Sequence, residues 1–115
     1  MTNLERYEAM DTNQLLIELK DLASSAEQEA IFAKHPQLRP DYDFLTHIQQ
    51  DSKIALRKSV EKMLEIMVKS MVLLLALDQK EGECRMQGME ELVADLAARV
   101  QDSTKKLLDL YTNSK

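Results

Sequence analysis

The sequence has 115 residues, 44% of them hydrophobic and 30% charged, values typical of a folded, soluble domain and not of a disordered chain. Two Gly, two Pro and no Trp, beside seven Met, predict an all-α fold over a single helical domain, residues 1–115. The formal net charge of −5 argues against binding to the phosphate backbone of nucleic acids and against adhesion to an anionic membrane, because both need a basic surface.

The first long helix is predicted over residues 12–33. Asp11 or Thr12 can accept hydrogen bonds from the free N–H groups of its first turn. Residues 3–10 are expected to form a short helical turn, whose simplest course is to continue into this helix. The predicted core stripe shrinks from leucine to alanine, which favours close approach of a neighbouring helix: Leu16, Leu19, Ala23, Ala26, Ala30 and Ala33.

The second helix is predicted over residues 41–80. Pro36 and Pro40 disfavour helix at the residues before them, and nothing breaks the pattern again until Gly82. Asp41 and Asp43 suit the positive end of the helix dipole. A stripe at helical spacing follows the whole segment: Leu45, Ile48, Leu56, Val60, Met63, Met67, Met71 and Leu74. Between residues 63 and 77 apolar side chains surround the helix, with only three polar residues among them.

The third helix is predicted over residues 86–111, where the amphipathic pattern is cleanest. Its apolar face is formed by Met89, Leu92, Val93, Leu96, Ala97, Val100, Leu107, Leu108 and Tyr111. Short connections favour antiparallel neighbours, so we expect an antiparallel bundle of three main helices, with the long second helix at its centre. The first helix should lie along residues 41–62 and the third along residues 60–80.

The apolar half of the central helix predicts association. A helix of residues 41–80 would be about 60 Å long, whereas a compact chain of this size is about 35 Å across. Because residues 63–77 are apolar on every side of the helix, a single neighbouring helix would leave part of this apolar surface exposed to water. A second copy of the chain is the simplest cover, and we expect dimerisation to complete the bundle. Two alternatives stay open: a kinked helix wrapped within one chain, and a different protein partner.

No catalytic or metal-binding pattern stands out. Asp43 and His47 are spaced to share a metal ion, but a helix-end carboxylate bonded to a surface histidine explains them as well. Cys84 lies between Glu83 and Arg85, whose charges act in opposite directions on a thiol. We therefore expect no metal, no cofactor and no enzymatic activity.

Two further clusters have a structural and a functional interpretation. Met63, Met67 and Met71, with Met86 and Met89 following, suit either a core or an adaptable recognition surface. The densest basic area, which has no aromatic residues interleaved, is better explained as the charged face of an exposed helix than as a nucleic-acid site: Lys53, Arg57, Lys58 and Lys62.

The function predicted from these patterns is that of a small helical dimer acting as an adaptor, chaperone, inhibitor or regulator through apolar helix faces. The predicted interface comprises Met63, Met67, Met71, Leu74, Leu75 and Leu77. The alternative is a bundle that binds a small molecule or cofactor in a pocket lined by Met and Leu. A single cysteine, which cannot form an intramolecular disulfide, and an N-terminus without a secretory pattern favour the cytoplasm.

Overall fold

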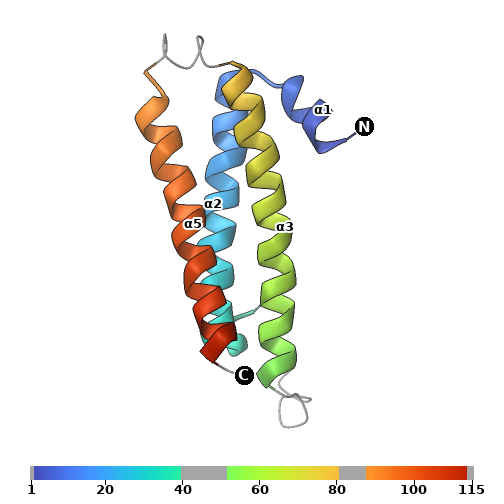
Figure 1. Ribbon diagram of the computed structural model, residues 1–115, viewed down its shortest axis with the longest axis vertical. Coiled ribbons are helices and arrows are strands. Elements are labelled where there is room, and N and C mark those ends of the chain that lie inside the picture. The colour runs from blue at the N-terminus through green and yellow to red at the C-terminus, as the bar shows by residue number, and fades with distance from the viewer. Residues whose placement is uncertain (1, 40–51, 81–87, 114–115) are drawn as a thin grey trace.

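The protein is a bundle of three long helices, seen in the computed structural model of Figure 1. The structure describes residues 2–39, 52–80 and 88–113, and these contain no strand. The long helices are α2 (Thr12–Lys34), α3 (Ser52–Gln79) and α5 (Glu90–Asn113). The short helix α1 (Asn3–Glu8) precedes α2, and the 3-10 turn η1 (Pro36–Leu38) follows it. The predicted all-α bundle of three main helices is therefore confirmed.

The start of α2 is fixed by its first residues, as the sequence predicted. The Asp11 carboxylate accepts from the Gln14 backbone N–H at 2.8 Å, and the Gln14 side chain accepts from the Asp11 N–H at 3.0 Å. This reciprocal pair satisfies two N–H groups that a helix start leaves unbonded. Asp11 adopts an extended backbone, so α1 ends before it. The expectation that residues 3–10 continue into the first helix is wrong for this reason.

The bounds of the other two predicted helices are tested only in part. The described part of the central helix begins at Ser52, and residues 41–51, with the predicted stripe members Leu45 and Ile48, lie outside the described residues. The third helix begins at Glu90, four residues later than predicted, and runs on to Asn113. Gly88, just before it, has a φ of +65°, a left-handed conformation that ends any helical run through this point.

The three long helices lie side by side over most of their lengths. In Figure 1 α2 and α5 run in one direction and α3 runs in the other, with α2 between α5 and α3 in this view. The molecule measures 54 × 28 × 20 Å. We predicted that the first helix would lie along residues 41–62 of the central helix and the third along residues 60–80. That was wrong, because α2 (23 residues) and α3 (28 residues) are similar in length and an antiparallel neighbour follows the whole of its partner.

The core face of α3 differs from the predicted stripe. Its members recur at intervals of three and four residues as far as Ala76, with Leu77 directly after it: Leu56, Ser59, Met63, Ile66, Ser70, Leu73, Ala76 and Leu77. Met67 and Leu74 are only partly buried, and Met71 is exposed. Small residues let the neighbouring helices approach, and Ser70 loses nothing by burial because its hydroxyl donates to the Ile66 carbonyl at 2.7 Å.

The opposing helices contribute leucine and alanine to the same core. α2 buries Leu15, Leu19, Ala23 and Ala26, and α5 buries Leu96, Val100 and Leu107. Three of the four buried apolar residues of α2 belong to the predicted stripe, whereas Leu15 is buried in place of Leu16, which is only partly buried. Tyr7 of α1 joins this cluster and is fully buried, although the six residues of its helix are too few to show a period.

One ion pair is buried at the end of the bundle where the C-terminal part of α2 lies beside the N-terminal part of α3. The Arg39 guanidinium, which follows η1, donates to the Glu29 carboxylate of α2 and, at 3.1 Å, to the Ser59 hydroxyl of α3. Both charged side chains are only 10% exposed, and the guanidinium lies 5.6 Å from the centre of the Phe32 ring. The pair therefore links α2, the η1 turn and α3 through one guanidinium group.

Candidate interaction surface

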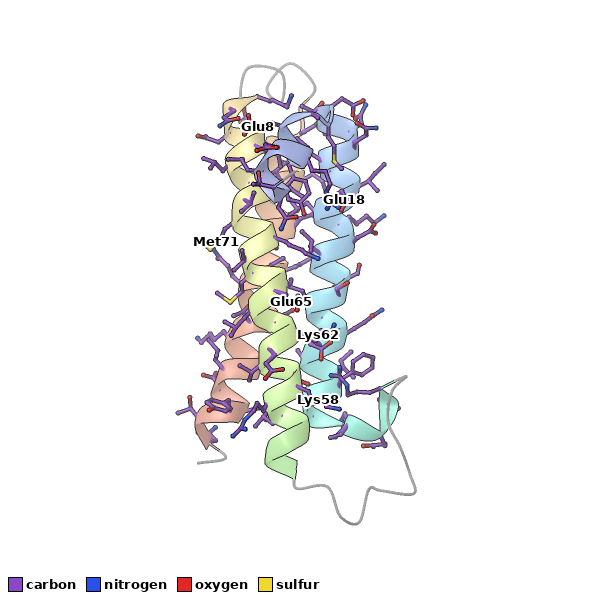
Figure 2. All side chains as sticks on the ribbon, turned by 90° about the vertical axis from the view of Figure 1, so that its right-hand side faces the viewer. Glu8, Glu18, Lys58, Lys62, Glu65 and Met71 are labelled. Atoms are coloured by element: carbon purple, nitrogen blue, oxygen red, sulfur yellow. The ribbon has the colours of Figure 1, made fainter. Side chains whose placement is uncertain are left out.

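One face of α3 carries large apolar side chains that no other described part of the chain covers. Leu64, Val68, Met71 and Leu75 are 52%, 56%, 66% and 49% exposed. They recur at intervals of four, three and four residues, so they lie in one strip along the helix, and we call this strip the outer α3 face. In Figure 2 Met71 projects on the side of α3 away from α2.

A groove between α3 and α5 adjoins the outer α3 face. It has a volume of about 550 Å³ and is lined on the α3 side by Met67, Met71 and Leu74. Ala97 and Leu108 line it from α5, where Leu108 is 43% exposed. Thr104, at its floor, is satisfied within its own helix because its hydroxyl donates to the Val100 carbonyl at 2.8 Å. The groove is thus mainly apolar, although Gln101, Lys105 and Asp109 also line it, and no buried polar side-chain atom of the described residues lacks a hydrogen-bond partner.

The α2–α3 side of the bundle is different, because it is covered. The short helix α1 lies against the upper part of α3 and places the Tyr7 ring in the core. The Thr2 hydroxyl caps the start of α1 by accepting from the Glu5 N–H at 3.2 Å, and the buried Tyr7 ring anchors the helix on the bundle. The apolar surface that α2 and α3 would share at this end is consequently already buried within the chain.

The α2–α5 side is bridged by charge. The Arg99 guanidinium of α5 donates two hydrogen bonds to the Glu27 carboxylate of α2, one of them 3.2 Å long. This hydrogen bonding lowers the pKa of Glu27 below its ordinary value, helped by the charges of Arg99 and Lys106 and opposed by slight burial. The surface around the pair is lined by polar residues of both helices, among them Asp102 and Asn113, together with the apolar Ile31 and Leu110. The α2–α5 side also has an exposed apolar residue, Ile31, which is 50% exposed, but the run of four large exposed apolar side chains lies on α3 beside the α3–α5 groove.

The structure distributes the six predicted interface residues over two environments. Met63 and Leu77 are 1% and 4% exposed and belong to the core of the chain itself. Met67 and Leu74 line the groove, while Met71 and Leu75 lie on the outer α3 face. Only these last four reach the surface, so any interface through this part of α3 must be built on them.

Sequence reasoning missed two members of this surface, Leu64 and Val68. Both were recognised as apolar residues of a helix that is apolar all round, but neither was placed at the interface. The signal was present as a second series at helical spacing, displaced around the helix from the core series of Met63, Ile66 and Ser70. The pattern alone does not say which of two such series is buried.

The methionine cluster is also divided. Met63 and Met89 are buried, Met67 is partly buried and Met71 is exposed, so both the core and the recognition interpretations apply to parts of it. Met86 lies outside the described residues, as do Asp43, His47, Cys84 and the acidic residues Glu81 and Glu83. Within residues 2–39, 52–80 and 88–113 no three His, Cys, Asp or Glu side chains gather as metal ligands would.

The basic cluster on α3 is mixed with acidic residues. Arg57, Lys58 and Lys62 are all exposed, but so are Glu61 and Glu65 between and beside them. Figure 2 shows Lys58 and Lys62 on the side of α3 next to α2, away from Met71. This alternation of charge lacks the concentrated positive surface that a phosphate backbone attracts.

Two general comparisons complete the description of the molecule. None of the helices in the described part of the chain is both long enough and apolar enough to span a membrane. Comparison of the chain with known protein families, with curated proteins and with solved structures finds no match.

Proposed function

We propose that this protein is a non-enzymatic interaction module that associates through the outer α3 face and the adjoining α3–α5 groove. Such a module would serve as an adaptor, chaperone, inhibitor or regulator, and its first expected partner is a second copy of itself. The observation that carries the proposal is the exposure of Leu64, Val68, Met71 and Leu75, four large apolar side chains in one strip. Contiguous exposed apolar surface of this kind is typical of sites of protein–protein contact.

The strength of association can be judged from these exposures. Full burial of a side chain of this size contributes about 1.5–3 kcal/mol, and each of the four is about half exposed, so each has about 1 kcal/mol left to contribute. Two copies of the outer α3 face therefore supply about 8 kcal/mol. Association itself costs about 4–15 kcal/mol, so the groove residues must contribute too. We expect reversible association, visible between micromolar and millimolar protein.

The test is the solution mass of the protein as its concentration changes. Sedimentation or light scattering from about 10 µM to about 1 mM should show the mass rising from 13.2 kDa toward twice that value. Met71→Glu should remain at the monomer mass, because it places a charge in the contact. Since Met71 is 66% exposed, this substitution should leave the fold intact, which circular dichroism would verify.

The matched control is Ile17→Glu on α2. Ile17 is 62% exposed, so the change in apolar surface and charge is the same, but the residue lies outside the proposed surface. It should associate as the wild type does. Wild-type protein that stays monomeric throughout, or equal association of Met71→Glu and wild type, would contradict the proposal.

A second candidate function is favoured by the volume of the groove. About 550 Å³ falls within the usual range of small-molecule pockets, and the lining of Met67, Met71 and Leu74 suits an apolar ligand. Native mass spectrometry of the purified protein should then detect a bound molecule, and Ala97→Trp, which fills the groove, should abolish it. A mass equal to that of the bare chain would leave the interaction module as the better account.

The cellular location proposed with this function is the cytoplasm. The support is the single cysteine of the sequence, Cys84, which has no second cysteine in the chain to pair with. Proteins stabilised in oxidising compartments generally carry paired cysteines. Fluorescence microscopy of the tagged protein in its own cell would test this location.

A further inference from the structure

A row of four exposed residues runs along α3 at steps of seven: Arg57, Leu64, Met71 and Asp78. Seven residues are close to two turns of an α-helix, so these side chains lie in line on one side of α3. The row has two apolar residues in the middle, a positive charge at one end and a negative charge at the other. Val68 and Leu75 of the outer α3 face lie in a second row beside it.

This row is complementary to itself when reversed. The midpoint between Arg57 and Asp78 is also the midpoint between Leu64 and Met71. A second copy turned by a two-fold axis through that midpoint therefore sets each Arg57 against the partner's Asp78, and each Leu64 against the partner's Met71. A two-fold interface has this property in general, since residue i meets residue j while j meets i.

We propose that the partner at this surface is a second copy of the chain, with the two α3 helices antiparallel and Arg57 of each paired with the partner's Asp78. The inference rests on the proposed function and adds the orientation of the partner and the residues that select it. A parallel pair of α3 helices would bring Arg57 to the partner's Arg57 and Asp78 to the partner's Asp78. Charge thus disfavours the parallel arrangement and favours the antiparallel one.

The dimensions of α3 allow this contact. From residue 57 to residue 78 the helix extends about 32 Å, and both residues lie inside the described helix Ser52–Gln79. The exposures of Met71 and Leu75 show that α1, which contacts α3 from another side, leaves the strip accessible. Glu61, one turn along from Arg57, is also exposed, so a negative charge introduced at position 57 would face two acidic residues.

Charge reversal tests the pairing. Arg57→Glu and Asp78→Arg should each weaken self-association about tenfold, because each places like charges together twice in a two-fold dimer. The double variant Arg57→Glu, Asp78→Arg restores opposite charges and should associate within about threefold of wild type. Added salt should reduce the effect of each single variant. Lys20→Glu, an equal charge change at an exposed residue of α2, should have no effect.

The direction of the two helices is tested independently with spin labels. A label at Lys58→Cys, in a Cys84→Ser background, adjoins the row without replacing a member of it. In the antiparallel dimer the two labels should be about 30 Å apart along the helix axis, whereas a parallel dimer brings them within about 20 Å. Electron paramagnetic resonance of the labelled dimer distinguishes these distances.

The outcomes separate this inference from the proposed function. Rescue by the double variant together with the long label distance supports it. Suppose that Met71→Glu abolishes the dimer, but that the double charge variant associates as weakly as the two single effects combined predict, or that the labels lie close together. The interaction surface then stands and the antiparallel pairing is overturned. If the wild-type chain does not self-associate at about 1 mM, the pairing is overturned together with the homodimer.

Discussion

Replacing Glu29 with Ala removes one half of the buried ion pair that joins three segments of the chain. In the native protein the Glu29 carboxylate accepts from the Arg39 guanidinium, and both side chains are 10% exposed. The substitution leaves a positive charge at a position with little access to water. The remaining contacts of that guanidinium include the Ser59 hydroxyl and the Phe32 ring.

The expected loss of stability follows from this burial. Removing one partner of a buried ion pair generally costs about 3–5 kcal/mol, because the other charge stays desolvated. Since Arg39 retains its hydrogen bond to Ser59 and a small exposed area, we expect about 3 kcal/mol for Glu29→Ala, near the lower limit. For a chain of this length that corresponds to a fall in melting temperature of about 10 °C.

Urea denaturation followed by circular dichroism measures this change, with the free energy of unfolding extrapolated to water. The matched control is Glu27→Ala, which removes the same side chain from the same helix but breaks the exposed pair with Arg99. It should cost only a small fraction as much, because exposed ion pairs contribute little. Replacing both Glu29 and Arg39 with Met should recover much of the loss, since both charges of this buried pair are then removed. Equal effects of Glu29→Ala and Glu27→Ala would refute the reasoning.

Two further predictions concern the exposed ion pair and the core. Because hydrogen bonding from Arg99 lowers the pKa of Glu27 in the folded protein, this pair stabilises the fold at neutral pH, and its contribution is lost as the pH falls below about 4.5. NMR titration should give a Glu27 midpoint below that of an unstructured Glu and a higher one in Arg99→Gln; identical midpoints in the two proteins would contradict the assignment. In the core, Leu73→Ala should destabilise the protein by about 2–5 kcal/mol, because Leu73 is fully buried. The control is Leu75→Ala, because Leu75 is 49% exposed. In denaturation of the dilute monomer it should lower the free energy of unfolding by well under half as much. A similar loss of stability at both positions would show that the burial assigned to α3 is wrong.

Helix ends were predictable where a local side chain determines them. The start of α2 follows from Asp11 and Gln14, which satisfy each other's backbone N–H groups without help from distant residues. The start of α5 was placed too early because the apolar spacing already begins at Met89, whereas the left-handed backbone of Gly88 delays the helix. The spacing of apolar residues therefore predicts the presence of a helix reliably, but it predicts the first residue of that helix less reliably.

The faces of the helices were predictable only where polar residues mark the opposite side. On α5 the predicted stripe contains the buried Leu96, Val100 and Leu107, because charged residues occupy the other face. On α3 nearly every residue from 63 to 77 is apolar, so the sequence leaves the direction of the core undetermined. Packing then buried Ser59 and Ser70, which a hydrophobic pattern excludes, because small side chains let helices approach closely.

The sequence by itself determined that this protein is helical and has three long helices. It also determined that α3 carries more apolar residues than a single core-facing side can hold. These features follow from propensity, punctuation and period, which act over a few neighbouring residues. Only the tertiary structure decided that Met63 belongs to the core while Met71 lies at the surface, and that Glu29 is buried against Arg39. The physical reason is that burial depends on where α2 and α5 lie around α3, and contacts between helices distant in sequence are not encoded in the spacing of any one of them.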